Sequence, residues 1–150
     1  MNNFKDKKIL VMGLGLHGGG LAIVKYLLKN KAKLTITDLK NVKELKPSLG
    51  KLAKYKNIKY TLGKHDFKDF KNQDLIIQNP GVPSNSKYLK IAHKNNIPLV
   101  NEAVMFFGLY PGKIIGITGT RGKSTTATLL NKILKKKIKG NILAGNIATV

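Results

Sequence analysis

The stretch that decides the fold is Lys8-Ile-Leu-Val-Met-Gly-Leu-Gly-Leu-His-Gly18, in which a short apolar run leads directly into a glycine-rich turn. An apolar run of this length bounded by glycines is typical of a strand that is buried on both faces of a sheet. The residues that follow, 19–29, carry leucines and valine at helical spacing and predict an amphipathic helix. A strand, a tight turn and a helix in this order begin a parallel α/β sheet.

The rest of the chain repeats this alternation, and we expect an α/β protein. Further strands are predicted at 33–37, 58–62, 74–78, 98–101, 113–118 and 141–144. Helices are predicted at 41–55, 86–95, 102–109 and 123–137. Pro47 must lie near an end of the first of these helices or break it, because proline lacks the amide that continues a helix.

A domain boundary is predicted at Tyr110-Pro111-Gly112, because proline and glycine together end regular structure. We therefore expect a Rossmann-like domain with a parallel sheet at 1–110. One strand-helix-strand unit cannot cover both faces of its own sheet. Residues 111–150 are accordingly expected to be the truncated start of a larger α/β domain.

The composition excludes several classes of site and protein. The chain has 150 residues, 42% of them hydrophobic, and no cysteine, so disulfides, thiolate zinc sites and cysteine nucleophiles are absent. His17, His65 and His93 show no metal-ligand spacing. No apolar stretch is long enough for a membrane helix, and the N-terminus leads into a strand pattern and not a signal peptide. We expect a cytoplasmic protein.

The formal net charge is +21, from 28 basic and 7 acidic residues. Arg121 is the single arginine, whereas nucleic-acid recognition favours the planar fork of that side chain. The lysines are also spread along the whole chain. A solvated lysine-rich surface is the better interpretation, so we expect neither nucleic acid nor a membrane as partner. Such a surface would still attract anionic nucleotides.

The first glycine turn fits a nucleotide-binding pattern. Gly13, Gly15 and Gly18 follow the spacing G-x-G-x-x-G between a strand and a helix, and Asp38 ends the second predicted strand. Gly13 would allow the tight turn, Gly15 the approach of a phosphate, and Gly18 close packing of helix and strand. The alternative is a plain strand-helix turn with Asp38 as a cap. Taken alone, the motif would suggest NAD.

The second glycine turn resembles a phosphate-binding P-loop. It is Thr118-Gly-Thr-Arg-Gly-Lys-Ser-Thr125, again between a predicted strand and a predicted helix. Ile117 stands where the strict pattern has its first glycine. Backbone amides of Gly119, Thr120, Arg121 and Gly122 can converge on a triphosphate, Lys123 can reach the outer phosphates, and the Ser124 hydroxyl can ligate Mg²⁺. We therefore expect the second domain to be a P-loop domain that binds ATP.

Together these two turns resemble the Mur ligase family. The run Gly116-Ile-Thr-Gly-Thr-Arg-Gly-Lys-Ser-Thr125 resembles its ATP loop, including the isoleucine. Upstream, Gly13 to Gly18, Asn79-Pro-Gly-Val-Pro83 and Asn96-Ile-Pro-Leu-Val-Asn-Glu102 are similar to the N-terminal domain of the member that adds D-glutamate. Downstream, Gly145-Asn-Ile147 is similar to another family segment. The resemblance covers nearly all of the chain.

The resemblance implies an ATP- and Mg²⁺-dependent amide ligase of peptidoglycan precursor synthesis. Its substrates would be UDP-N-acetylmuramoyl-L-alanine and D-glutamate, joined through an acyl phosphate, and we expect a monomer. The implied UDP-substrate contacts are Gly13, Gly15, Leu16, His17, Gly18, Asp38, Asn79, Pro80, Gly81 and Asn146. The implied ATP contacts are Gly119 to Thr125, with Lys123 as catalytic residue and Ser124 as metal ligand.

Family members are much longer, so the resemblance also implies that this chain is an N-terminal part and is inactive by itself. Two alternatives remain within nucleotide binding: a non-catalytic nucleotide-binding module, and a family member that adds a different amino acid. An NAD-dependent oxidoreductase is a further alternative, and the second glycine turn argues against it.

Overall fold

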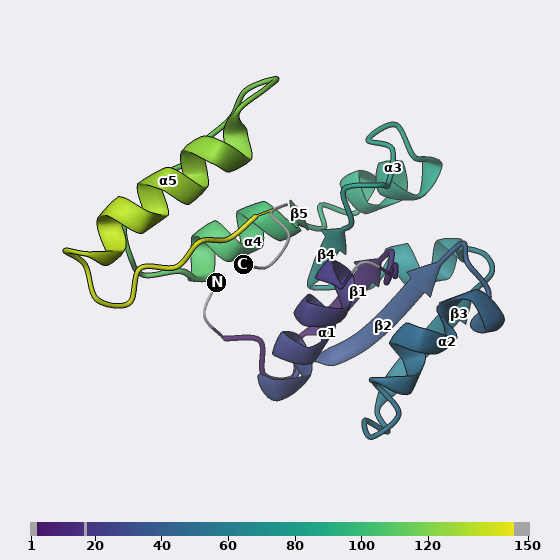
Figure 1. The fold of residues 1–150 in the computed structure, drawn as a ribbon. Coiled ribbons are helices and arrows are strands. Elements are labelled where there is room, and N and C mark those ends of the chain that lie inside the picture. Colours follow the sequence, from purple (N-terminus) through teal and green to yellow (C-terminus); the bar gives the residue numbers. More distant parts are fainter. Residues whose placement is uncertain (1–2, 17, 146–150) are drawn as a thin grey trace. The chain divides into compact units, whose positions relative to one another are not determined.

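A computed structural model describes residues 3–16 and 18–145 of the chain. The elements are β1 (Lys8–Met12), α1 (Gly19–Lys29), β2 (Lys33–Asp38), α2 (Val42–Gly50), β3 (Ile58–Leu62), the 3₁₀ helix η1 (Phe67–Phe70), β4 (Leu75–Gln78), α3 (Lys87–Lys94), β5 (Leu99–Asn101), α4 (Glu102–Leu109) and α5 (Lys123–Lys135) (Figure 1). The chain divides into two compact units, Met1–Pro111 and Gly112–Val150. The first unit contains every described strand.

The five strands form one sheet in the order β3-β2-β1-β4-β5, and all four pairings are parallel. This confirms the expected α/β fold with a parallel sheet. From β1 the chain moves outward to β2 and β3, and it then returns to pair β4 with the other side of β1. The strand order therefore reverses between β1 and β4, which is the place where open α/β sheets bind ligands.

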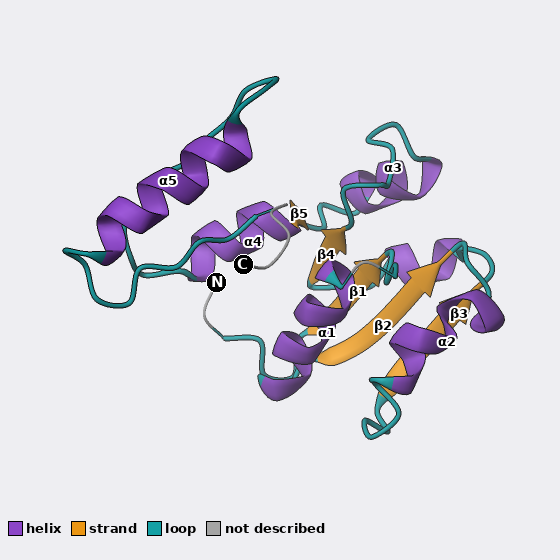
Figure 2. Ribbon diagram, in the orientation of Figure 1, coloured by secondary structure: helices purple, strands orange, loops and turns teal. Residues whose placement is uncertain are grey.

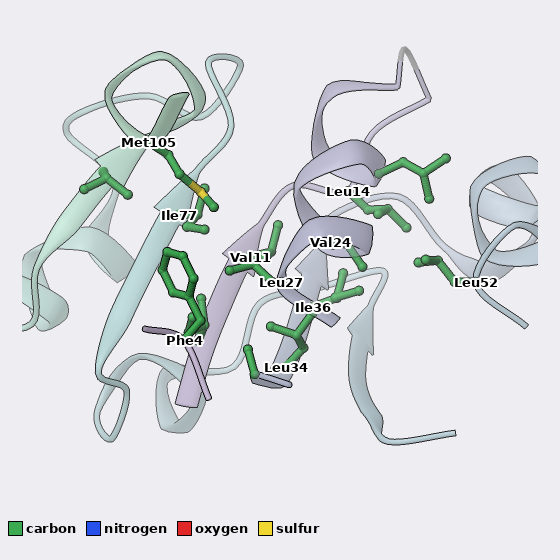
Figure 3. Close-up of a cluster of buried hydrophobic side chains, with 14 of the residues drawn as sticks. Phe4, Val11, Leu14, Val24, Leu27, Leu34, Ile36, Leu52, Ile77 and Met105 are labelled. Carbon is green, nitrogen blue, oxygen red and sulfur yellow. The ribbon is translucent and has the colours of Figure 1, made fainter. Parts of the chain in front are cut away.

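The sheet has an apolar core on each face, because alternate residues of a strand point to opposite sides. On one face, Val11, Ile36 and Ile77 pack with Val24 and Leu27 of α1 (Figure 3). On the other face, residues such as Leu10 and Ile76 pack with Phe70 of η1 and Leu89 of α3. Burial on both faces explains why β1 reads as a continuous apolar run.

The start of α2 shows why the chain turns into a helix there. The Asn41 side chain accepts the amides of Lys43 and Glu44, and the Glu44 carboxylate accepts the amide of Asn41 at 2.8 Å. This reciprocal pair satisfies amides that a helix start otherwise leaves unpaired. The helix ends at Gly50, earlier than predicted, and Pro47 lies inside it. Pro47 is exposed, so water can solvate the carbonyl that loses its partner.

The strands predicted at 113–118 and 141–144 are wrong: neither segment is a strand in the described structure, and Figure 2 draws both as loop. An isolated strand leaves its backbone groups unpaired, so it needs a neighbour and a covering layer. The described part of the second unit offers a single helix, α5, none of whose residues is buried. The helix itself forms as predicted, two residues shorter at its end. The described residues 112–145 therefore show no sheet of a P-loop domain.

Within residues 3–16 and 18–145, no helix is long and apolar enough to cross a membrane.

Two isoleucine variants test this description. Ile36→Ala removes a fully buried side chain of β2 and should lower the free energy of unfolding by about 2–5 kcal/mol in urea titrations. Ile115→Ala, in the segment predicted as a strand, removes a side chain that is 62% exposed and should change it by less than about 0.5 kcal/mol. A comparable loss for Ile115→Ala would mean that this segment packs in a sheet after all.

Candidate functional site

The first glycine turn lies at the carboxyl end of β1, beside the end of β4. Its residues Gly13 and Gly15 have backbone φ angles of 94° and 63°, values that residues other than glycine rarely adopt. Gly18 has φ of 97° and forms the N-cap of α1. The turn therefore lies where the strand order reverses, and its positive φ values favour glycine.

Asp38 holds this turn from the end of β2. Its Oδ2 accepts the amides of Leu14 at 2.9 Å and Gly15 at 3.0 Å, and its Oδ1 accepts the amide of Lys40 at 2.9 Å. The side chain is 7% exposed. Three amide donors compensate the buried carboxylate. The Gly15 amide is thus already bonded within the protein, so a phosphate near this residue would have to bind other donors.

Asn79, Pro80 and Gly81 follow β4 and lie against the glycine turn. The Asn79 amide donates to the Met12 carbonyl at 3.0 Å, and its side-chain oxygen accepts the amide of Gly81 at 3.0 Å. A Cβ built on Gly13 would lie 2.8 Å from the Cβ of Asn79. The two turns are therefore in close contact, and the structure brings the residues of Gly13–Leu16, Asp38 and Asn79–Gly81 together at one edge of the sheet.

Three further residues at this edge were not expected from the sequence. The Ser48 hydroxyl of α2 donates to the Gly15 carbonyl at 2.8 Å. Ser48 lies three residues after buried Leu45 and four before buried Leu52, so helical spacing could have placed it on the inner face. Thr37, at the end of β2, and Glu102, directly after β5, occupy positions at carboxyl strand ends that could have been singled out in the same way.

Thr37 connects the sheet to a group of aromatic rings. Its Oγ1 lies 2.6 Å from Nδ1 of His65, and the His65 ring meets the rings of Phe70 and Tyr88 edge to face. Burial lowers the pKa of His65, and the Asp38 carboxylate opposes this in part. The imidazole is therefore held neutral at pH 7, in contact with a threonine hydroxyl.

Glu102 brings a second carboxylate to the glycine turn. A Cβ built on Gly19, the first residue of α1, would lie 2.5 Å and 2.7 Å from the two carboxylate oxygens of Glu102. Burial raises the pKa of Glu102 above its usual range. A Cβ built on Gly20 would instead lie against the carbonyl oxygens of Leu14 and Gly13. The start of α1 is thus packed against the turn on one side and against Glu102 on the other.

The second glycine turn lies at the start of α5, in the other unit. Gly122 has φ of 76° and is the N-cap, so Lys123, Ser124 and Thr125 form the first helical turn. Nζ of Lys123 donates to the carbonyl oxygens of Gly119 and Thr120. Ser124 and Thr125 line an open hollow of about 360 Å³. The lysine thus lies over the loop, and the two hydroxyls are accessible.

Two of the predicted site residues, His17 and Asn146, lie outside the described residues. Leu16 is 44% exposed beside the first turn. Among the residues that the structure describes, no group of three or more carboxylates and histidines could hold a metal ion.

A family model described as "Mur ligase MurD-like, N-terminal domain" matches residues 7–101, which span all five strands. The chain belongs to this family. The match confirms the resemblance seen in the first glycine turn and the segments that follow it; the second glycine turn lies beyond the matched residues.

Relatives by sequence carry the name UDP-N-acetylmuramoylalanine--D-glutamate ligase. The protein from Borreliella burgdorferi is 45% identical over 98% of this chain, and the one from Treponema pallidum is 37% identical over 95%. These alignments cover 32% and 27% of the two relatives, so the chain spans about a third of their length.

Solved structures support the fold. The pseudomurein peptide ligase type C from Methanothermus fervidus superposes with a TM-score of 0.52 at 30% identity, covering 87% of this chain and 26% of its own. The UDP-N-acetylmuramate-alanine ligase MurC from Thermotoga maritima gives a TM-score of 0.55 at 23% identity, covering 86% and 29%.

The two neighbouring glycines at the start of α1 should differ in their tolerance of alanine. Gly20→Ala places a methyl group 2.5 Å from a backbone oxygen and should lower the free energy of unfolding by about 1–3 kcal/mol. Gly19→Ala meets only the end of the flexible Glu102 side chain and gains helix propensity of about 1 kcal/mol, so it should stay within about 1 kcal/mol of the wild type. Urea unfolding measures both; equal losses would contradict the described packing.

The neutral state of His65 should make stability depend on pH. Because its pKa is lower in the folded chain, the unfolded chain binds the proton more readily, and the free energy of unfolding falls as the pH drops through about 6.5. His65→Gln should flatten this part of the curve between pH 7.5 and 5.5, as measured by chemical unfolding. His93→Gln, at an exposed position of α3, is the matched control. An unchanged slope in His65→Gln would contradict the proposed environment of the ring.

Proposed function

We propose that this chain is the substrate-binding N-terminal part, with the start of the ATP-binding domain, of a ligase of peptidoglycan precursor synthesis. The complete enzyme would add D-glutamate to UDP-N-acetylmuramoyl-L-alanine. The observation that carries the proposal is a glycine turn at the point of strand reversal, in a chain of the MurD-like family. The names of the relatives support the choice of D-glutamate.

The UDP-substrate would bind at the first turn. We assign it to Gly13, Gly15, Leu16, His17, Gly18, Asp38, Asn79, Pro80, Gly81 and Asn146. A carboxylate can accept about four hydrogen bonds, and Asp38 already accepts three. One position thus remains for a hydroxyl or imide donor of the nucleoside. The amides at the start of α1 are the donors that suit its phosphates.

ATP would bind as a substrate at the second turn, through Gly119, Thr120, Arg121, Gly122, Lys123, Ser124 and Thr125. The donor set fits: a helix N-terminus capped by a left-handed glycine, a lysine over the loop, and two accessible hydroxyls. Ser124 would ligate Mg²⁺, which neutralises negative charge on the phosphates when bound. The chain spans about a third of the length of the Borreliella burgdorferi protein, and the sheet of this domain would form only in the complete enzyme.

The chemistry follows from the poor reactivity of a carboxylate, whose leaving group would be oxide. A carboxylate oxygen of the muramoyl-alanine forms a bond to the γ-phosphorus while ADP leaves. The amine of D-glutamate then attacks the acyl carbon, phosphate leaves and the amine loses a proton. Lys123 and the loop amides would stabilise the charge on the phosphoryl group as it moves. The first turn would fix the far end of the substrate.

The variant Gly15→Asn tests whether the UDP-substrate binds at the first glycine turn. Asparagine tolerates φ of 63°, and a Cβ here would meet only the Nδ2 of Asn79, at 3.8 Å. The variant should therefore keep its stability within about 1 kcal/mol while its side chain fills the space of the ligand. By titration calorimetry, the wild-type chain should bind UDP-N-acetylmuramoyl-L-alanine and not NAD. Gly15→Asn should bind it at least about tenfold more weakly.

Gly140→Asn is the matched control, because Gly140 has φ of 80° and lies in open space in the other unit. Absence of binding in a folded wild-type chain refutes the proposal that the UDP-substrate binds here.

In the complete protein, phosphate release from ATP should depend on D-glutamate. Release with another amino acid would identify a different family member, and binding without release a non-catalytic nucleotide-binding module.

A further inference from the structure

Helix α4 is the last element of the first unit, and its composition is unusual for this chain. Lysine and arginine make up 28 of the 150 residues, yet neither occurs between Asn95 and Gly112, the longest stretch without them. Glu102 is the single charged residue of this stretch. The lysine-rich surface of the protein is therefore interrupted at α4.

One side of α4 belongs to the first core. Met105 is buried in that core, and Leu109, one turn later, packs against it. The helix also contacts β5 and α1. A helix with a single buried side normally carries polar residues on its other sides. In α4 the other sides are apolar as well, which is typical of a helix that is buried all round.

Three large apolar side chains of α4 nevertheless face solvent in this structure. Val104 and Phe106 are each 46% exposed, and Phe107 is 56% exposed. The Phe106 ring stacks on the ring of Tyr110 with 5.5 Å between centroids, and its centroid lies 6.0 Å from that of Phe107. We call Val104, Phe106, Phe107 and Tyr110 the α4 patch. Aromatic side chains without charges are typical of the centre of a protein interface.

The chemistry of the α4 patch favours a protein as its partner. A nucleic acid or an anionic membrane would be bound through lysines beside the aromatic rings, and this stretch has none. A separate protein, a second copy of the chain included, needs about 800 Å² on each side for stable binding. A whole aromatic side chain buries only about 150–250 Å², so four partly buried side chains do not supply that area.

A covalently attached domain does not need so large a contact. Its connection to the chain keeps it near the patch at an effective concentration in the millimolar range, so a small apolar contact is enough to hold it. The chain spans about a third of the length of its relatives. Helix α4 also lies at the end of the first unit, directly before the boundary at Pro111.

We propose that the α4 patch is the docking surface for another domain of the complete enzyme, outside these 150 residues, whose contact surface is apolar. This inference rests on the proposed function, in which the chain is one part of a longer ligase. Helix α4 contacts α1, whose N-cap Gly18 ends the first glycine turn. The docked domain is thereby connected through two helices to the turn that would bind the UDP-substrate.

The test measures the thermal unfolding midpoint of serine variants in two proteins, the complete enzyme and the 150-residue chain. Phe107→Ser should lower the midpoint of the complete enzyme by at least about 3 °C, because a covered aromatic side chain is lost. In the 150-residue chain this side chain faces solvent, so the shift should stay below about 1 °C.

Val104→Ser and Val42→Ser are a matched pair of variants. Both valines are exposed and lie near the start of a helix, Val104 in α4 and Val42 in α2. Only Val104→Ser should lower the midpoint of the complete enzyme, and neither variant should change that of the 150-residue chain. An equal shift for Val42→Ser would show that the loss is not specific to the α4 patch and would overturn the inference.

Equal shifts of Phe107→Ser in the two proteins, or no shift in the complete enzyme, also overturn the inference. So does a dimer of the 150-residue chain in sedimentation that Phe107→Ser abolishes, because the partner is then a second copy. Failure of the proposed function looks different. In that case the folded wild-type chain does not bind UDP-N-acetylmuramoyl-L-alanine, whatever the serine variants do.

Discussion

The pairing of one carboxylate oxygen with two successive amides holds the candidate site together. Oδ2 of Asp38 accepts the amides of Leu14 and Gly15, and this fixes the first glycine turn to the end of the neighbouring strand. Without it, a buried charge and two backbone amides would lose their partners together. The position of α1, which begins where the turn ends, depends on the same bonds.

The remaining contacts at the turn extend this constraint to the neighbouring elements. Ser48 of α2 bonds the Gly15 carbonyl, Asn79 lies against Gly13, and Glu102 lies against Gly19. Elements that follow β2 and β4 thus meet the turn that follows β1, and the element after β5 meets the first residue of α1. Contacts from several elements thus hold the shape of the turn, and such preorganisation lowers the entropic cost of binding a ligand.

Much of the first unit could be predicted from the sequence. The apolar run of β1 and the glycines after it have a single good interpretation, because a strand buried on both faces and a turn with positive φ leave few other residue choices. The hydrogen-bond partners of side chains were harder to predict. Asp38 could be placed at the turn, but nothing in the pattern showed that its oxygens bond to amides of the turn.

The two segments wrongly predicted as strands, 113–118 and 141–144, have the local sequence of strands, but the described chain lacks the partners that would pair with them. Strand propensity is a property of the local sequence, whereas a sheet also requires neighbouring strands to pair with.

The order of the strands has a consequence for how the protein folds. β1 lies at the centre, but its pairing with β4 joins segments far apart in the chain, as the bond between Lys8 and Asp74 across 66 residues illustrates. Parallel pairings of this kind form slowly, because the chain must close a long loop before the contacts repay its entropy. The β1–β2 pair can form as soon as β2 has left the ribosome, whereas the contact between Gly13 and Asn79 exists only after β4 has docked. A ligand that binds beside Gly13 would stabilise the β1–β4 pairing, which joins the two halves of the sheet.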